Sequence, residues 1–197
     1  MENKVELEKI LNSNEKYSSD YTSKLLEDKE GCKKFIQELK TYLDEHKPIS
    51  KIFLDEDCII PSVDKTNLSR ALEEFRIHSR TSILSEKKRL LYIIREEELL
   101  TTINKLQGRL EEYDKYVSEN GEDATVRKYS NQQLQEFAII RSQSLPMYLV
   151  ELETLSSATK DNESNYVNST DNAYMYASGI KEFLETELNG KRNRCNG

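Results

Sequence analysis

The stretch from Lys65 to Glu119 places the strongest limit on how this chain folds. Its 55 residues include no proline and one glycine, and apolar side chains recur at helical spacing from Leu68 to Val117. A continuous helix of this length would extend about 80 Å, whereas a compact globule of such a chain has a radius of gyration of about 16 Å. The stretch therefore predicts an elongated all-α protein built on one long central helix.

A narrow apolar seam runs along the second half of this stretch. Its members are spaced alternately four and three residues apart, the heptad pattern of a coiled coil: Leu99, Ile103, Leu106, Leu110, Tyr113 and Val117. Because the residues between them are mostly polar, the seam needs a neighbouring helix, from this chain or from another. We interpret it as a partner-binding seam for other helical protein subunits, with a hetero-oligomer favoured over a homodimer.

Residues 90–94 of the same stretch, Leu-Leu-Tyr-Ile-Ile, are all apolar. Five consecutive apolar residues cover more than one face of a helix, because successive side chains point about 100° apart. We therefore expect at least two helices to pack around this section.

Two further segments show heptad spacing. Residues 17–46 predict a single helix of about 30 residues, with heptad positions Tyr21, Leu25, Asp28, Cys32, Phe35, Leu39, Tyr42 and His46. The other begins at Ser130 and Gln133, which have the spacing of a capping box, and Pro146 predicts a kink just before it. Since Asn120-Gly121 is a natural helix stop, this segment should return along the long helix.

These patterns divide the chain into five regions. They are an N-terminal heptad helix region (1–47), an acidic and apolar connector (48–64), a coiled-coil hairpin of the long helix and the kinked returning helix (65–160), a polar flexible loop (161–171), and a short C-terminal helix with a basic tail (172–197).

The connector contains an apolar triplet followed directly by an acidic one: Ile52, Phe53, Leu54, Asp55, Glu56 and Asp57. One interpretation is a linker whose apolar residues pack on neighbouring helices. The alternative is a linear motif that adds as a strand to a partner's sheet edge. Apolar triplets beside acids resemble SUMO-interacting motifs.

Composition limits the partners. A third of the residues are charged and the formal net charge is −7, which argues against direct binding of nucleic acid through bulk electrostatics. Three widely spaced cysteines offer no CxxC pair, which fits a reducing, intracellular setting. No apolar run is long enough to cross a bilayer. We expect an intracellular protein without membrane insertion, with the nucleus favoured over the cytoplasm because of the basic tail.

The residues of common active sites are sparse. The only two histidines, His46 and His78, have no histidine or cysteine at metal-ligand spacing, and no glycine-rich phosphate loop occurs. We expect no catalytic, cofactor-binding or metal-binding residues and a protein that is not an enzyme.

Two functional hypotheses remain. The first is a non-enzymatic structural coiled-coil subunit of a multiprotein assembly. This type of architecture resembles small helical kinetochore subunits, which makes a kinetochore or centromere complex the leading host. The alternative is a stand-alone helical adaptor that binds a peptide or nucleic acid through one face, with basic residues near the middle of the long helix: Arg76, Arg80, Lys87, Lys88 and Arg89.

Overall fold

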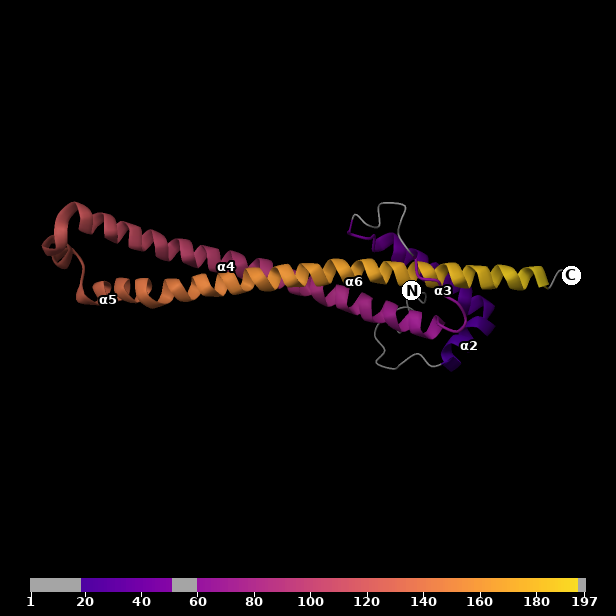
Figure 1. Cartoon of the computed structure of the whole chain (residues 1–197). Coiled ribbons are helices and arrows are strands. Elements are labelled where there is room, and N and C mark those ends of the chain that lie inside the picture. The colour runs from indigo at the N-terminus through magenta and orange to yellow at the C-terminus, as the bar shows by residue number, and fades with distance from the viewer. Residues whose placement is uncertain (1–18, 51–59, 195–197) are drawn as a thin grey trace. The chain divides into compact units, whose positions relative to one another are not determined.

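The computed structural model describes residues 19–50 and 60–194, and every regular element in these two ranges is helical (Figure 1). The elements are α2 (Ser19–Glu27), α3 (Lys29–Glu45), α4 (Leu68–Lys128), α5 (Asn131–Ile139), the π-helix η2 (Ile140–Ser144) and α6 (Leu145–Arg194). The all-α prediction with one long central helix is confirmed. Two compact units divide the chain: unit 1 holds the described residues up to Glu86 and from Glu163 onward, and unit 2 spans Lys87–Asn162.

Three helices build the core of unit 1. Their buried apolar side chains recur every three or four residues, so each helix turns one stripe toward the others. The stripes are Cys32, Phe35, Leu39 and Tyr42 on α3, Leu68, Leu72 and Phe75 on α4, and Ala173, Ala177, Ile180 and Leu184 on α6. The predicted heptad positions in α3 are therefore core positions, and their neighbours are helices of the same chain.

The predicted single helix over residues 17–46 is wrong at Asp28. There the chain breaks into α2 and α3, because the Asp28 carboxylate accepts hydrogen bonds from the amides of Glu30 (3.1 Å) and Gly31 (3.0 Å) and caps α3. A side chain at Gly31 would collide with this carboxylate. An aspartate at a heptad position was thus the sign of a helix start.

The chain between α3 and α4 is fastened to α6 within unit 1. The carboxylate of Asp171, a buried residue of α6, accepts hydrogen bonds from the amides of Ile49 (2.7 Å) and Ser50 (3.2 Å). Further along, the carbonyl oxygen of Pro61 comes so near to Gly179 of α6 that a Cβ there would lie 2.6 Å from it. These two contacts hold the described ends of the connector on one helix.

The hairpin of unit 2 has the predicted helix stop and helix start, with one difference. Gly121 interrupts α4 with φ 80°, as expected for the Asn120-Gly121 pair, but helical structure resumes and continues to Lys128. Ser130 then caps α5: its hydroxyl accepts from the amide of Gln133, whose side chain accepts from the amide of Ser130. The predicted capping box is confirmed.

The expected distortion before Pro146 is a π-helix. At the end of η2 the amide of Leu145 donates to the carbonyl of Ile140, five residues back. The wider turn accommodates a residue that lacks an amide donor and whose ring would crowd the carbonyl four residues earlier. The proline therefore changes the helix locally without ending it.

The predicted flexible loop at 161–171 is wrong, and so is a separate short C-terminal helix from residue 172. Helix α6 runs without interruption through both. Tertiary contacts explain the difference, because Ser169, Thr170 and Asp171 are buried. The Thr170 hydroxyl is hydrogen-bonded to that of Ser82 at 2.6 Å. Polar side chains that indicated a solvated loop are instead partners within unit 1.

Candidate partner-binding surface

The predicted partner-binding seam is covered by this chain itself, which corrects its assignment. Leu99, Ile103 and Leu110 are buried. Leu106 and Tyr113 pack with Leu110 against the returning segment, where Phe137 and Ile140 are buried. The remaining seam residue, Val117, is partly buried. The seam thus closes the hairpin, and only Leu106, Tyr113 and Val117 keep part of their surface accessible.

Aromatic side chains close the turn end of the hairpin. The ring of Tyr113 stacks on Phe137 at 4.4 Å between centroids, and Tyr129 meets both rings edge to face. The Lys128 ammonium lies 3.7 Å from the centroid of the Tyr116 ring. Tyrosine suits such a partly wet position because its body is apolar and its tip polar.

Ion pairs set the antiparallel register of the two sides. Arg109 on α4 pairs with Glu136 on α5 at 2.8 Å, and Arg95 on α4 pairs with Glu151 on α6 at 2.6 Å. The hydrogen bond from Arg109 lowers the pKa of the Glu136 carboxyl below its ordinary value. Because all four side chains are exposed to water, these pairs align the hairpin more than they stabilise it.

A second apolar stripe lies on the opposite side of α4 from the closed seam. Leu90 and Ile94 precede Leu99 and Ile103 by nine residues each, which is about two and a half helical turns. They therefore point away from the returning helix and are 54% and 55% exposed. We call Lys87, Leu90, Ile94 and Glu97, spaced three, four and three residues apart, the outer face of α4.

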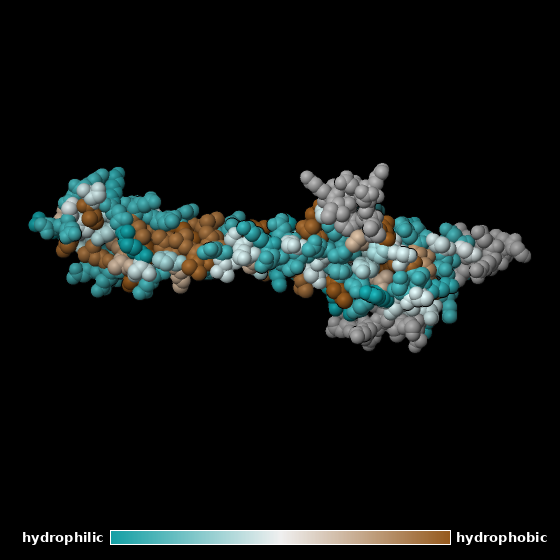
Figure 2. Space-filling model, viewed as in Figure 1, coloured by the Kyte–Doolittle hydropathy of each residue, from teal (hydrophilic) through white to brown (hydrophobic). Residues whose placement is uncertain are grey.

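The exposed apolar surface continues around the hairpin. Ten large apolar residues of unit 2 are each more than 40% exposed. Eight of them lie in two short segments of α4 and α6, and we call these eight the apolar girdle: Leu90, Leu91, Ile93, Ile94, Leu100, Met147, Leu149 and Val150. Figure 2 shows brown surface where Figure 1 labels α5 and along the neighbouring stretch of α4, while the girdle residues themselves lie on α4 and α6. Single exposed apolar residues are ordinary on a protein surface, but eight in two short segments of one hairpin indicate an interaction site.

Sequence reasoning found half of this girdle. The apolar run at residues 90–94 predicted that at least two helices pack around this section. Four of its five side chains are nevertheless exposed. The α6 residues of the girdle, Met147, Leu149 and Val150, were not predicted, because they do not occupy heptad positions. The signal was present as four consecutive apolar residues, 147–150, after the proline. Such a run covers more of the helix surface than one neighbour can bury.

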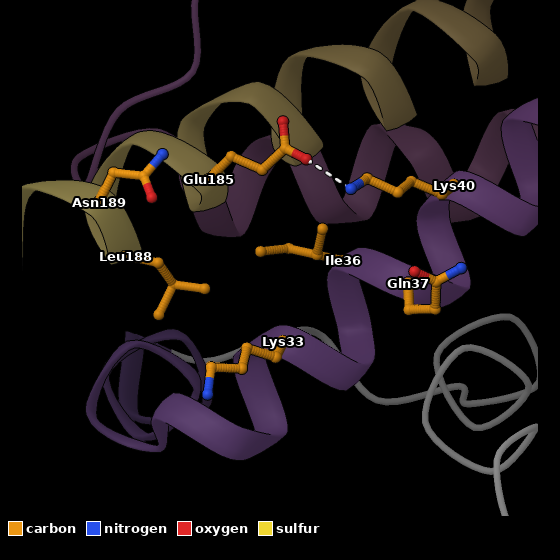
Figure 3. Close-up of a pocket in the computed structure, with 7 residues that line it drawn as sticks. All are labelled: Lys33, Ile36, Gln37, Lys40, Glu185, Leu188 and Asn189. Atoms are coloured by element: carbon orange, nitrogen blue, oxygen red, sulfur yellow. Dashed lines mark ion pairs between the residues drawn. The ribbon is translucent and has the colours of Figure 1, made fainter. Parts of the chain in front are cut away.

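Unit 1 has a separate shallow groove between α3 and α6, with a volume of about 480 Å³. Its lining consists of Lys33, Ile36, Gln37, Lys40, Glu185, Leu188 and Asn189. Figure 3 shows the ion pair across it, in which the Lys40 ammonium lies 3.0 Å from the Glu185 carboxylate. Burial opposes ionisation of Glu185, but Lys40 and Lys181 outweigh it and lower the pKa of the carboxyl. The lining includes no nucleophile paired with a base.

The two histidines are packed against aromatic rings in unit 1. His46 ends α3 and stacks on Tyr42 with ring centroids 4.2 Å apart. His78 stacks on Tyr176 of α6 at 5.9 Å and lies 3.6 Å from the Glu74 carboxylate. Burial lowers the pKa of His78, and the charge of Glu74 opposes that shift only in part.

Two further predictions concern the connector and the basic residues of α4. The candidate linear motif, Ile52, Phe53, Leu54, Asp55, Glu56 and Asp57, lies outside the described residues. Of the basic residues assigned to a nucleic-acid face, Arg76 is buried and ion-paired with Glu73, so it is not available to a ligand. That interpretation loses one of its five cations.

No group of three or more histidine, cysteine, aspartate or glutamate side chains gathers as a metal site in residues 19–50 and 60–194. Nor does any helix in these ranges combine the length and apolar character that a membrane span requires. Comparison of the chain with protein-family models, with curated proteins and with solved structures finds no match.

Proposed function

We propose that this protein is a non-enzymatic structural subunit of a multiprotein assembly, and that its apolar girdle binds helices of partner subunits. The observation that carries the proposal is the exposure of all eight girdle residues, between 41% and 64%, in a chain of which a third is charged. The closed seam no longer contributes, because its neighbour belongs to the same chain.

The size of the girdle supports a stable rather than a passing contact. Full burial of one large aliphatic side chain contributes about 1.5–3 kcal/mol, so covering eight that are roughly half exposed contributes on the order of 6–12 kcal/mol. Association costs about 4–15 kcal/mol in lost freedom of motion. A partner must therefore cover most of the girdle, and a helix or helical hairpin lying along α4 and α6 has the length to do so.

The proposal also concerns which assembly contains this subunit. We infer a nuclear host of the kinetochore or centromere type, because small helical subunits of such complexes share this kind of architecture. A fluorescently tagged full-length chain should then gather at centromeres in dividing cells. Uniform cytoplasmic fluorescence would exclude this host while leaving a structural role elsewhere.

The proposal is tested by purifying the full chain from its own cells and mapping cross-links to partner proteins. We expect co-purifying polypeptides in fixed ratio, cross-linked beside the girdle, and their loss in the variant Met147→Glu with Val150→Glu. Ser157→Glu, an exposed change on the same helix, should keep them. Partners that stay bound to the Met147 and Val150 variant, or a chain that purifies alone and stays soluble, would contradict the proposal.

A further inference from the structure

The two ends of the exposed apolar run in α4 carry opposite charges. Lys87, Lys88 and Arg89 precede the apolar run Leu90–Ile94, and Arg95 and three glutamates, Glu96 to Glu98, follow it. Lys87, Lys88, Glu96 and Glu97 are all exposed. Among the described residues, none of these four takes part in an ion pair. The helix thus carries opposite, uncompensated charges at the two ends of an apolar stripe.

This order is self-complementary for two antiparallel copies of α4. If two copies cross with their midpoints at Tyr92, Lys87 of one lies opposite Glu97 of the other, and Leu90 lies opposite Ile94. A two-fold symmetric interface requires this property, since every contact occurs twice with the roles exchanged. A parallel pair would instead place Lys87 against Lys87 and Glu97 against Glu97.

The geometry of the outer face agrees with the charge order. The spacing of three, four and three residues along Lys87, Leu90, Ile94 and Glu97 is that of a coiled-coil seam. Leu90 and Ile94 would form its apolar centre, and the Lys87 and Glu97 pairs would close its two ends. Leu91 and Ile93 flank this centre and are 64% and 41% exposed, so a second helix would also cover their edges.

We propose that the outer face of α4 binds a second copy of this chain, with the two α4 helices antiparallel and the two-fold axis midway between Leu90 and Ile94 along the helix. The inference rests on the proposed function, because it treats the girdle as an interface, and it names the partner for the half formed by Leu90, Leu91, Ile93 and Ile94. The other half, Leu100, Met147, Leu149 and Val150, is left for a different subunit. Charge complementarity selects the second copy, because an unrelated helix would have to carry an acid and a base on one face at the same spacing and in the matching order.

The test measures the dimer of the purified full chain by sedimentation equilibrium. We expect a dimer, with the dissociation constant raised at least tenfold in Lys87→Glu and in Glu97→Lys. Each variant places like charges opposite each other. An equal mixture of the two should recover the wild-type constant as a one-to-one heterodimer. The variant Glu111→Lys makes the same charge change as Glu97→Lys at an exposed position further along α4 and should dimerise normally.

Orientation is tested by disulfide formation, with Cys58 and Cys195 changed to serine and the buried Cys32 kept. A mixture of Leu90→Cys and Ile94→Cys chains should cross-link more than either chain alone. Stronger cross-linking of the Leu90→Cys chain to itself would indicate parallel helices and overturn the inference. A wild-type chain that stays monomeric, or a dimer indifferent to the charge changes, would overturn it too.

Failure of this inference and failure of the proposed function give different results. A monomeric chain that still co-purifies with other subunits through the girdle contradicts only the second copy. A charge-dependent dimer that binds no other subunit supports the second copy and contradicts the wider assembly.

Discussion

Asp171 provides the sharpest test of how unit 1 is held together. Its carboxylate is buried on α6 and accepts hydrogen bonds from the amides of Ile49 at 2.7 Å and Ser50 at 3.2 Å. A hydrogen bond to a charged group contributes about 1.5–3 kcal/mol. Because Ile49 is itself exposed, water can satisfy part of the loss in Asp171→Ala. We therefore expect the free energy of unfolding to fall by about 2–4 kcal/mol.

The isosteric variant Asp171→Asn separates the charge from the shape. Its remaining carbonyl oxygen can still accept from one amide, while its amide group would face the other donor, so about half of the loss is expected. Glu163→Ala serves as the control, because it removes an exposed carboxylate from the same helix. Substitutions at such surface positions usually change stability by no more than about 0.5 kcal/mol.

Urea unfolding followed by circular dichroism measures the change in stability, and hydrogen exchange locates it. In Asp171→Ala the amides of Ile49 and Ser50 should lose protection before the core of unit 1 does. If Asp171→Ala is as stable as Glu163→Ala, the carboxylate does not fasten the connector. Unchanged exchange at Ile49 and Ser50 would refute the reasoning in the same way.

Three further predictions concern single positions. Gly179→Ala should destabilise unit 1 by about 1–3 kcal/mol, because the new Cβ would lie 2.6 Å from the carbonyl oxygen of Pro61. Gly108→Ala, with open space around it, should stabilise its helix by about 0.5–1 kcal/mol. Equal shifts of the melting temperature in the two variants would contradict the steric argument. Burial lowers the pKa of His78 below its ordinary 6.5, so the folded state binds fewer protons than the unfolded state. The stability that neutral His78 contributes is therefore complete above about pH 6.5 and should decrease as the pH falls through the folded-state pKa. A pH dependence of the urea midpoint that is identical in His78→Gln would count against that assignment. Ser130→Ala should cost about 1 kcal/mol and speed hydrogen exchange in the first turn of α5, and exchange as slow as in the wild type would argue against the cap.

Local signals predicted the helices and several of their boundaries. Apolar spacing identified Phe35, Leu39 and Leu110 as buried positions, since a helix must turn such a stripe away from water wherever its neighbour comes from. The capping box at Ser130 and the distortion before Pro146 were also predicted correctly. Each depends on atoms within one or two turns of the chain, which the sequence specifies directly.

Two polar signals were misread. Asp28 occupied a heptad position but caps a helix through the amides of the residues just after it, a local signal that the heptad spacing concealed. Polar residues near Asp171 suggested a loop but are buried within α6, because their hydrogen-bond partners come from distant segments of the chain. The packing role of Gly179 has no local signal in the sequence, because the carbonyl that it accommodates belongs to Pro61, in a distant segment of the chain.

The sequence by itself determined that this chain is helical, that its long helix carries apolar stripes, and where its hairpin turns, because periodicity and capping are local properties of the backbone. Only the tertiary structure decided which stripe is already covered. The returning helix takes the stripe of Leu99 and Leu110 and leaves Leu90 and Ile94 exposed. One neighbour buries one side of a helix, and which side it takes depends on how the whole chain packs.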